Sequence, residues 1–140
     1  MTYLFHLIEP GKKLRITKKA IAKMLNLPLH LIVRVECWTY VIFIHRQDRG
    51  GQFISYRRFK EWQNAVASHI QKCQTLSQLN SLWIAIELDW HRYSAQYPDK
   101  YLEFVRQIWS ETFASLSQSR SSGLRAIYSP VTPRETATIN

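Results

Sequence analysis

The chain has 140 residues, of which 46% are hydrophobic and 13% aromatic, which is enough for one buried core and typical of a single domain. Its longest apolar runs, 27–33 and 38–44, are much shorter than the roughly 18 residues that cross a bilayer, and the amino terminus lacks a secretory-signal pattern. Two cysteines are too few for a disulfide framework, so we expect a cytoplasmic protein that neither enters a membrane nor depends on disulfides.

Charge is distributed unevenly along the chain. Residues 1–73 contain 13 of the 19 lysines and arginines against four carboxylates, so this segment carries +9, which equals the formal charge of the whole chain. Residues 74–116 carry −2, and residues 117–140 carry +2. A basic half joined to a mildly acidic, tryptophan-rich half indicates a polyanion-binding part and a packing or partner-binding part.

The start of the chain predicts one strand and one short helix. Residues 3–8 (YLFHLI) are interpreted as a strand, with a turn at 9–11. Thr17 is a suitable N-cap for a helix over 18–26, whose apolar side contains Ile21, Met24 and Leu25.

Residues 31–56 predict a β-hairpin. The segment 31–46 is dense in Val, Ile and aromatic residues, which favours one long strand. The glycines in 48–51 (DRGG) suit a tight turn, and residues 52–56 form the returning strand.

Helices are predicted for most of the remaining chain. Apolar residues spaced by three or four indicate a helix over 57–73 and another whose apolar seam covers 76–93 and which is broken at 96–98. Pro98 suits the first position of a further helix, so residues 76–116 are expected to form a helical hairpin. From Ser117 onward the apolar periodicity stops, which predicts a disordered tail.

These elements together predict an α+β fold. We expect one compact domain over 1–116, in which a small antiparallel hairpin or sheet in the basic part, 1–73, is packed by helices. The helical hairpin, 76–116, extends this domain, and residues 117–140 form the disordered tail.

Residues 18–37, KKAIAKMLNLPLHLIVRVEC, resemble the helix-turn-helix of repressor-type DNA-binding proteins. Asn26 stands at the turn, and the apolar positions of the pattern are matched by Ile21, Ala22, Leu27, Ile32 and Val35. The resemblance implies a recognition helix over 29–35, and it makes 38–56 similar to the wing of winged-helix proteins. A recognition helix presents polar side chains to bases, whereas 29–35 is mainly Leu, Ile and Val, so a short helix leading into a strand is the favoured alternative.

Two groups of cations are candidate phosphate contacts. The first group lies on and before the short helix and contains Lys12, Lys13, Arg15, Lys18, Lys19 and Lys23. The second lies on the hairpin and the helix after it and contains Arg46, Arg49, Arg57, Arg58 and Lys60. Aromatic residues lie among the second group and, if exposed, would stack on single-stranded bases, although we favour their packing in the core: Trp38, Tyr40, Phe53 and Tyr56.

The sequence contains no catalytic motif that we identify. Glu87 and His91 stand one turn apart with Asp89 between them, but one such pair does not make a metal site, and a solvated helix face explains them more simply. No glycine-rich phosphate loop, nucleophile elbow or zinc-protease helix occurs. We therefore expect no enzyme, no metal and no cofactor.

The charge pattern predicts a non-enzymatic nucleic-acid-binding protein, with a transcriptional regulator as one form of it. The two cation groups would contact the phosphate backbone, and DNA is favoured over RNA as the partner. The alternative is an assembly factor that binds an acidic protein through a tryptophan face, Trp83, Trp90 and Trp109. The same helical hairpin also offers a surface for a homodimer.

Overall fold

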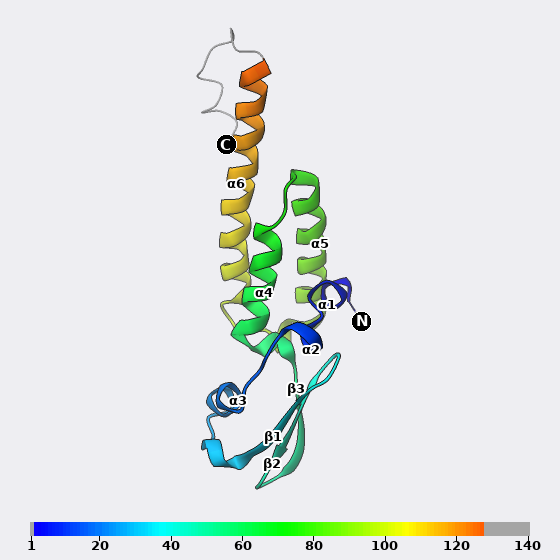
Figure 1. Ribbon diagram of the computed structural model, residues 1–140, viewed down its shortest axis with the longest axis vertical. Coiled ribbons are helices and arrows are strands. Elements are labelled where there is room, and N and C mark those ends of the chain that lie inside the picture. The colour runs from blue at the N-terminus through cyan, green and yellow to red at the C-terminus, as the bar shows by residue number, and fades with distance from the viewer. Residues whose placement is uncertain (1, 128–140) are drawn as a thin grey trace.

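A computed structural model describes residues 2–127 as an α+β structure with two ends (Figure 1). A three-stranded antiparallel sheet lies at one end, together with the short helix α3 (Lys18–Leu25). The long helices α4 (Lys60–Gln71), α5 (Leu76–Tyr93) and α6 (Tyr101–Ile127) form a bundle that extends away from the sheet. The predicted fold class is confirmed.

The sheet has the order β1-β2-β3, with β1 (Ile32–Cys37), β2 (Ile42–Arg46) and β3 (Gly50–Ile54). The prediction of one long strand over 31–46 is wrong, because a turn separates β1 from β2, with the Trp38 N–H donating to the Val41 carbonyl at 3.0 Å. The hairpin turn between β2 and β3 is confirmed, and Gly50 there has a φ of 78°, which favours glycine.

The amino-terminal segment is helical, so the prediction of a strand over 3–8 is wrong. Helix α1 (Tyr3–Ile8) buries Leu4, Phe5 and Ile8, which the helical period brings to one side. Glu9, with a φ of 51°, links α1 to the one-turn helix α2 (Pro10–Lys13).

Helix α3 begins and ends as the sequence predicted. The Thr17 hydroxyl accepts a hydrogen bond from the Ala20 N–H at 3.1 Å, and Asn26 ends the helix with a φ of 56°. A single 3₁₀ turn, η1 (Leu29–Leu31), then leads into β1. The segment that the helix-turn-helix resemblance assigns to a recognition helix is therefore mostly strand.

The bundle contains the helix over 76–93 that the sequence predicted, with Leu76 and Tyr93 as its ends. The 3₁₀ turn η2 (Tyr56–Arg58) precedes α4, and another, η3 (Ser94–Gln96), follows α5. Helix α6 packs on α4 as well as on α5, so the predicted helical hairpin is part of a three-helix arrangement. Helix α6 continues beyond Ser117 to Ile127, and the remainder of the predicted tail, 128–140, lies outside the described residues.

One continuous hydrophobic core joins the two ends. The inner face of the sheet contributes Ile42, Ile44 and Ile54, and the helices contribute large buried side chains such as Trp62 and Tyr101. Among the described helices, none combines the length and the hydrophobicity that a bilayer span requires.

Candidate nucleic-acid interface

The outer face of the sheet, opposite the core, carries an unusual set of side chains. Because side chains alternate along a strand, the buried Ile42 and Ile44 place Phe43 and His45 of β2 on the outer face. The strand register brings Phe53 of β3 opposite Phe43, and Arg34 of β1 opposite His45. This face therefore combines aromatic rings with a cation.

Three rings on this face contact one another, and we call Trp38, Phe43 and Phe53 the aromatic cluster. The ring centroids of Trp38 and Phe43 lie 5.3 Å apart in a stacked arrangement, and those of Phe43 and Phe53 lie 4.9 Å apart. Trp38 and Phe53 meet edge to face at 5.6 Å. Trp38 is 44% exposed and Phe53 is 59% exposed, so this is an aromatic cluster open to solvent.

The exposure of these rings corrects our favoured interpretation of the hairpin aromatics. Trp38, Tyr40 and Phe53 are exposed and do not pack in the core, whereas Tyr56 is buried as expected. The Tyr56 hydroxyl donates to the Trp38 carbonyl at 2.5 Å, which fixes the backbone beneath the cluster. The interpretation failed because the sheet covers the core mainly with isoleucines, Ile32, Ile42, Ile44 and Ile54, and leaves the aromatic residues on its outer face.

A polar network borders the aromatic cluster on β1. Glu36 accepts hydrogen bonds from the Trp38 indole N–H at 3.0 Å and from the His45 imidazole at 2.9 Å, and it pairs with Arg34 at 2.9 Å. The bond from Trp38, followed by that from His45, lowers the pKa of Glu36 below its ordinary value. The network holds the Trp38 ring in place and leaves the Glu36 charge compensated.

A glycine makes room for the central ring. A Cβ atom at Gly51 would lie 2.5 Å from Cζ of Phe43, closer than any real contact, so the Phe43 ring lies over the bare backbone of β3. The position of this ring therefore depends on the absence of a side chain at 51.

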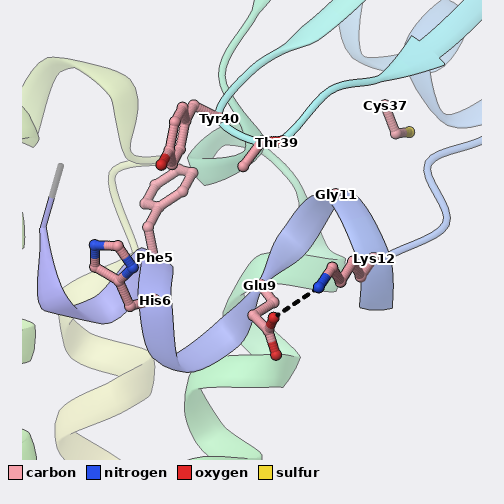
Figure 2. Close-up of a pocket in the computed structure, with 8 residues that line it drawn as sticks. All are labelled: Phe5, His6, Glu9, Gly11, Lys12, Cys37, Thr39 and Tyr40. Carbon is pink, nitrogen blue, oxygen red and sulfur yellow. Dashed lines mark ion pairs between the residues drawn. The ribbon is translucent and has the colours of Figure 1, made fainter.

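The first predicted cation group is exposed throughout: Lys12, Lys13, Arg15, Lys18, Lys19 and Lys23. Figure 2 shows Lys12 paired with Glu9. The two atoms that form this ion pair are 3.5 Å apart. Both residues line a cavity of about 250 Å³, which the neighbouring Tyr40 and Phe5 rings also line. Lys12, followed by Lys13, lowers the pKa of Glu9. Helix α3 buries Ile21 and Ala22 against the core, so Lys19 and Lys23 project from the opposite side of that helix.

The second predicted cation group divides into exposed and buried members. Arg49, Arg58 and Lys60 are exposed. Arg46 is buried and donates to both carboxylate oxygens of Asp48, at 2.9 and 2.7 Å, which lowers the pKa of Asp48. We therefore remove Arg46 from the predicted phosphate contacts, because its guanidinium is already occupied.

Arg57 is also removed, because it forms a buried ion pair between the sheet end and the bundle. Its Nε and Nη2 donate to the two oxygens of Asp89, each at 2.7 Å. Arg57 is 5% exposed and Asp89 is fully buried. The Arg57 guanidinium also lies 3.9 Å from the centre of the Tyr93 ring. We call Arg57 and Asp89, with the groups that bond them, the buried junction.

Asp89 corrects the expectation of a solvated helix face on α5. Burial raises the pKa of Asp89, but hydrogen bonds from Arg57, Thr2 and Tyr97 outweigh burial and hold the pKa below its ordinary value. A sequence signal for this residue existed. Asp89 continues the buried row of Leu82 and Ile86 along α5, so an acid stands where the helical period demands an apolar side chain.

The described residues contain no cluster of three His, Cys, Asp or Glu side chains that could hold a metal ion, and Glu87 and His91 gain no third partner.

The tryptophans of the alternative surface, Trp83, Trp90 and Trp109, are half-buried and pack against the core. The ring centroids of Trp83 and Trp109 lie 5.6 Å apart.

Comparisons of the chain with models of protein families, with curated proteins and with solved structures found no match.

Proposed function

We propose that this protein is a non-enzymatic nucleic-acid-binding protein that contacts phosphates through exposed cations of its basic half. The observation that carries the proposal is a set of exposed cations without an ion-pair partner among the described residues: Arg15, Lys18, Lys19, Lys23, Arg49, Arg58 and Lys60. Uncompensated positive charge attracts polyanions and releases their counterions on binding.

The aromatic cluster favours nucleic acid over other polyanions. Nucleic acids offer phosphates to cations and flat bases to aromatic rings, and Arg34 lies on the same sheet face as Phe43 and Trp38. We do not propose a repressor-type helix-turn-helix regulator, because the segment after α3 enters β1 instead of forming a recognition helix.

The acidic-protein alternative has less support. Its three tryptophans contribute to packing between α5, α6 and the core, so little of their surface is free for a partner. Nucleic acid therefore remains the proposed partner.

Salt dependence of binding tests the proposal. Fluorescence anisotropy with a labelled strand and a labelled duplex is measured over a salt series, and log affinity is expected to fall linearly with log salt, by about 0.9 per contacted phosphate on duplex. Absence of binding to either probe at low salt contradicts the proposal.

A matched pair of variants locates the phosphate contacts. The double variant Lys18→Glu, Lys19→Glu is expected to weaken binding and reduce the salt slope. The control double variant Lys100→Glu, Arg106→Glu changes the net charge equally, but its exposed residues lie in the acidic half. Equal losses from both would show that net charge, and not the basic half, determines binding.

A further inference from the structure

We infer that the outer face of the sheet binds single-stranded nucleic acid by stacking its bases on the aromatic cluster. This inference rests on the proposed function and assigns it a ligand class and a binding surface. It concerns Trp38, Phe43 and Phe53, together with Arg34 on the same face, Arg49 in the β2–β3 turn and Arg58, which lines a hollow with Phe53.

The contacts between the rings stabilise the sheet as a cross-strand pair does, but they leave much of the aromatic surface exposed. On the inner face of the same strands, Ile42, Ile44 and Ile54 are buried and supply the hydrophobic contacts that hold the sheet to the core. Trp38 and Phe53 keep about half of their surface in water, although large rings gain most when they are buried. A contiguous exposed patch of this kind marks an interaction site.

The rings are also held in fixed positions before any ligand arrives. The register pairs Phe43 with Phe53, Gly51 admits the Phe43 ring over the strand, and Glu36 holds the Trp38 indole through a bond of 3.0 Å. Little side-chain freedom is left to lose on binding, which favours affinity. Fixed, exposed rings about 5 Å apart suit the flat faces of nucleobases.

The charges around the cluster fit a polyanion. Arg34 shares the outer face, Arg49 lies in the β2–β3 turn, and Arg58 borders the same hollow of about 270 Å³ as Phe53. The carboxylate on this face, Glu36, is bonded by Arg34, His45 and Trp38, and the one in the turn, Asp48, is bonded by Arg46. Phosphates would therefore meet the guanidinium groups of Arg49 and Arg58, which have no ion-pair partner among the described residues, and carboxylates whose charge is compensated.

A single strand fits this face better than a duplex. In a duplex each base is stacked and paired inside the helix, so its flat faces are not available to protein rings, whereas the bases of a single strand can be splayed onto them. The sheet presents its rings on an open surface, where splayed bases can reach them. The inferred ligand is therefore a single strand, and the preference for DNA over RNA stays a prediction.

The first experiment distinguishes the contribution of the bases to binding from that of the phosphates. Binding is measured for oligothymidine, oligouridine, a duplex and an abasic deoxyribose-phosphate strand, all of one length. We expect the two base-bearing strands to bind at least about tenfold more tightly than the abasic strand, because stacking contributes at each base. A preference between oligothymidine and oligouridine, which differ in the sugar and in the 5-methyl group of thymine, would refine the ligand within the inferred class. Equal affinity for the abasic strand would overturn the inference.

The second experiment removes one ring at a time. Phe53→Ala and Trp38→Ala are each expected to weaken binding to oligothymidine about tenfold, and Phe53→Trp to retain it because a ring is still present. Tyr3→Ala is the control, since Tyr3 is an aromatic residue that is 64% exposed on α1, away from the sheet. Thermal unfolding verifies that each variant is folded.

The outcomes distinguish the two proposals. If no probe binds at low salt, the proposed function fails and the inference fails with it. The other case is that single strands bind and the Lys18→Glu, Lys19→Glu variant binds them more weakly, while Phe53→Ala and Trp38→Ala bind them like the unmodified protein. The proposed function then stands, and the sheet face is not the binding site.

Discussion

The buried junction and the aromatic cluster reverse the usual partition of side chains in opposite ways. The junction places two charges, Arg57 and Asp89, inside the protein, whereas the cluster places large apolar rings outside it. Inside, each charge is met by hydrogen bonds from the chain itself. Outside, the described residues leave the rings in water. The junction is complete without a partner, and the cluster would gain from one.

Two consecutive arginines show the same contrast at the smallest scale. Arg57 and Arg58 share the 3₁₀ turn η2, yet Arg57 is enclosed by Asp89 and aromatic rings while Arg58 is exposed. Residue type alone therefore does not assign an arginine to binding or to structure, since the partner that encloses Arg57 lies on another helix.

The largest expected effect is at the buried junction. Asp89→Ala leaves the Arg57 guanidinium buried without its partner, and we expect the free energy of unfolding to fall by about 3–5 kcal/mol. Urea denaturation measures this loss. Asp99→Ala, at an exposed carboxylate, is the control and should change stability by no more than about 0.5 kcal/mol. A loss below about 1 kcal/mol at Asp89 would show that the junction does not stabilise the fold as its geometry indicates.

Acid should weaken the same junction in the unmodified protein. The folded pKa of Asp89 lies below its ordinary value of 3.8, so the unfolded chain binds a proton more readily than the folded one. The contribution of Asp89 is therefore complete above that ordinary value and is lost as the pH falls through the lower, folded pKa. Urea unfolding from about pH 5 to about pH 2 should show a shallower decline in an Asp89→Asn variant. An unchanged slope would assign acid sensitivity to other carboxylates.

Periodicity in the sequence was sufficient to predict the helices that present one simple face to the core. Helix α5 and the capped helix α3 were found because their apolar residues recur every three or four positions. The helix over residues 3–8 was not predicted, because a six-residue apolar run fits a strand as well as a helix. The helix is the form that buries Leu4, Phe5 and Ile8 together.

The candidate site was predictable only in part, because it depends on contacts between distant residues. The exposed lysines follow from local sequence, but the enclosure of Arg57 depends on Asp89, which lies 32 residues away. The two faces of the sheet were open to prediction, since Ile42, Phe43, Ile44 and His45 alternate branched apolar and aromatic side chains. The prediction did not use that alternation, because it assigned all of the hairpin aromatics to the core.

Two adjacent glycines allow the stability of the sheet to be separated from its binding. Gly50→Ala places a Cβ on a residue with a φ of 78° and has open space around it, so we expect a loss of about 1–2 kcal/mol in unfolding free energy. Affinity for oligothymidine should not change, because the aromatic cluster is untouched. Chemical denaturation and anisotropy measure the two quantities in the same variant.

Gly51→Ala should show the reverse pattern. Its Cβ would meet the Phe43 ring, which can turn toward solvent, so stability should change by only about 0.5 kcal/mol. Displacing the central ring should nevertheless weaken binding of a base-bearing strand while leaving the abasic strand unaffected. If Gly51→Ala binds oligothymidine normally, the arrangement of the three rings is not what the ligand recognises.

The smallest expected effect on stability is at Arg58, which follows Arg57 in the chain. Arg57 belongs to the buried junction, where the largest effect is expected. Because its side chain is exposed and has no ion-pair partner among the described residues, Arg58→Ala should change the free energy of unfolding by no more than about 0.5 kcal/mol. If it contacts a phosphate, the salt slope on a single strand should fall by about 0.7. Lys72→Ala, at an exposed cation beyond the end of α4, should leave that slope unchanged. A slope that falls equally in both variants would mean that the strand is attracted by the general charge of the surface, whereas a fall in Arg58→Ala alone would place a phosphate beside Phe53.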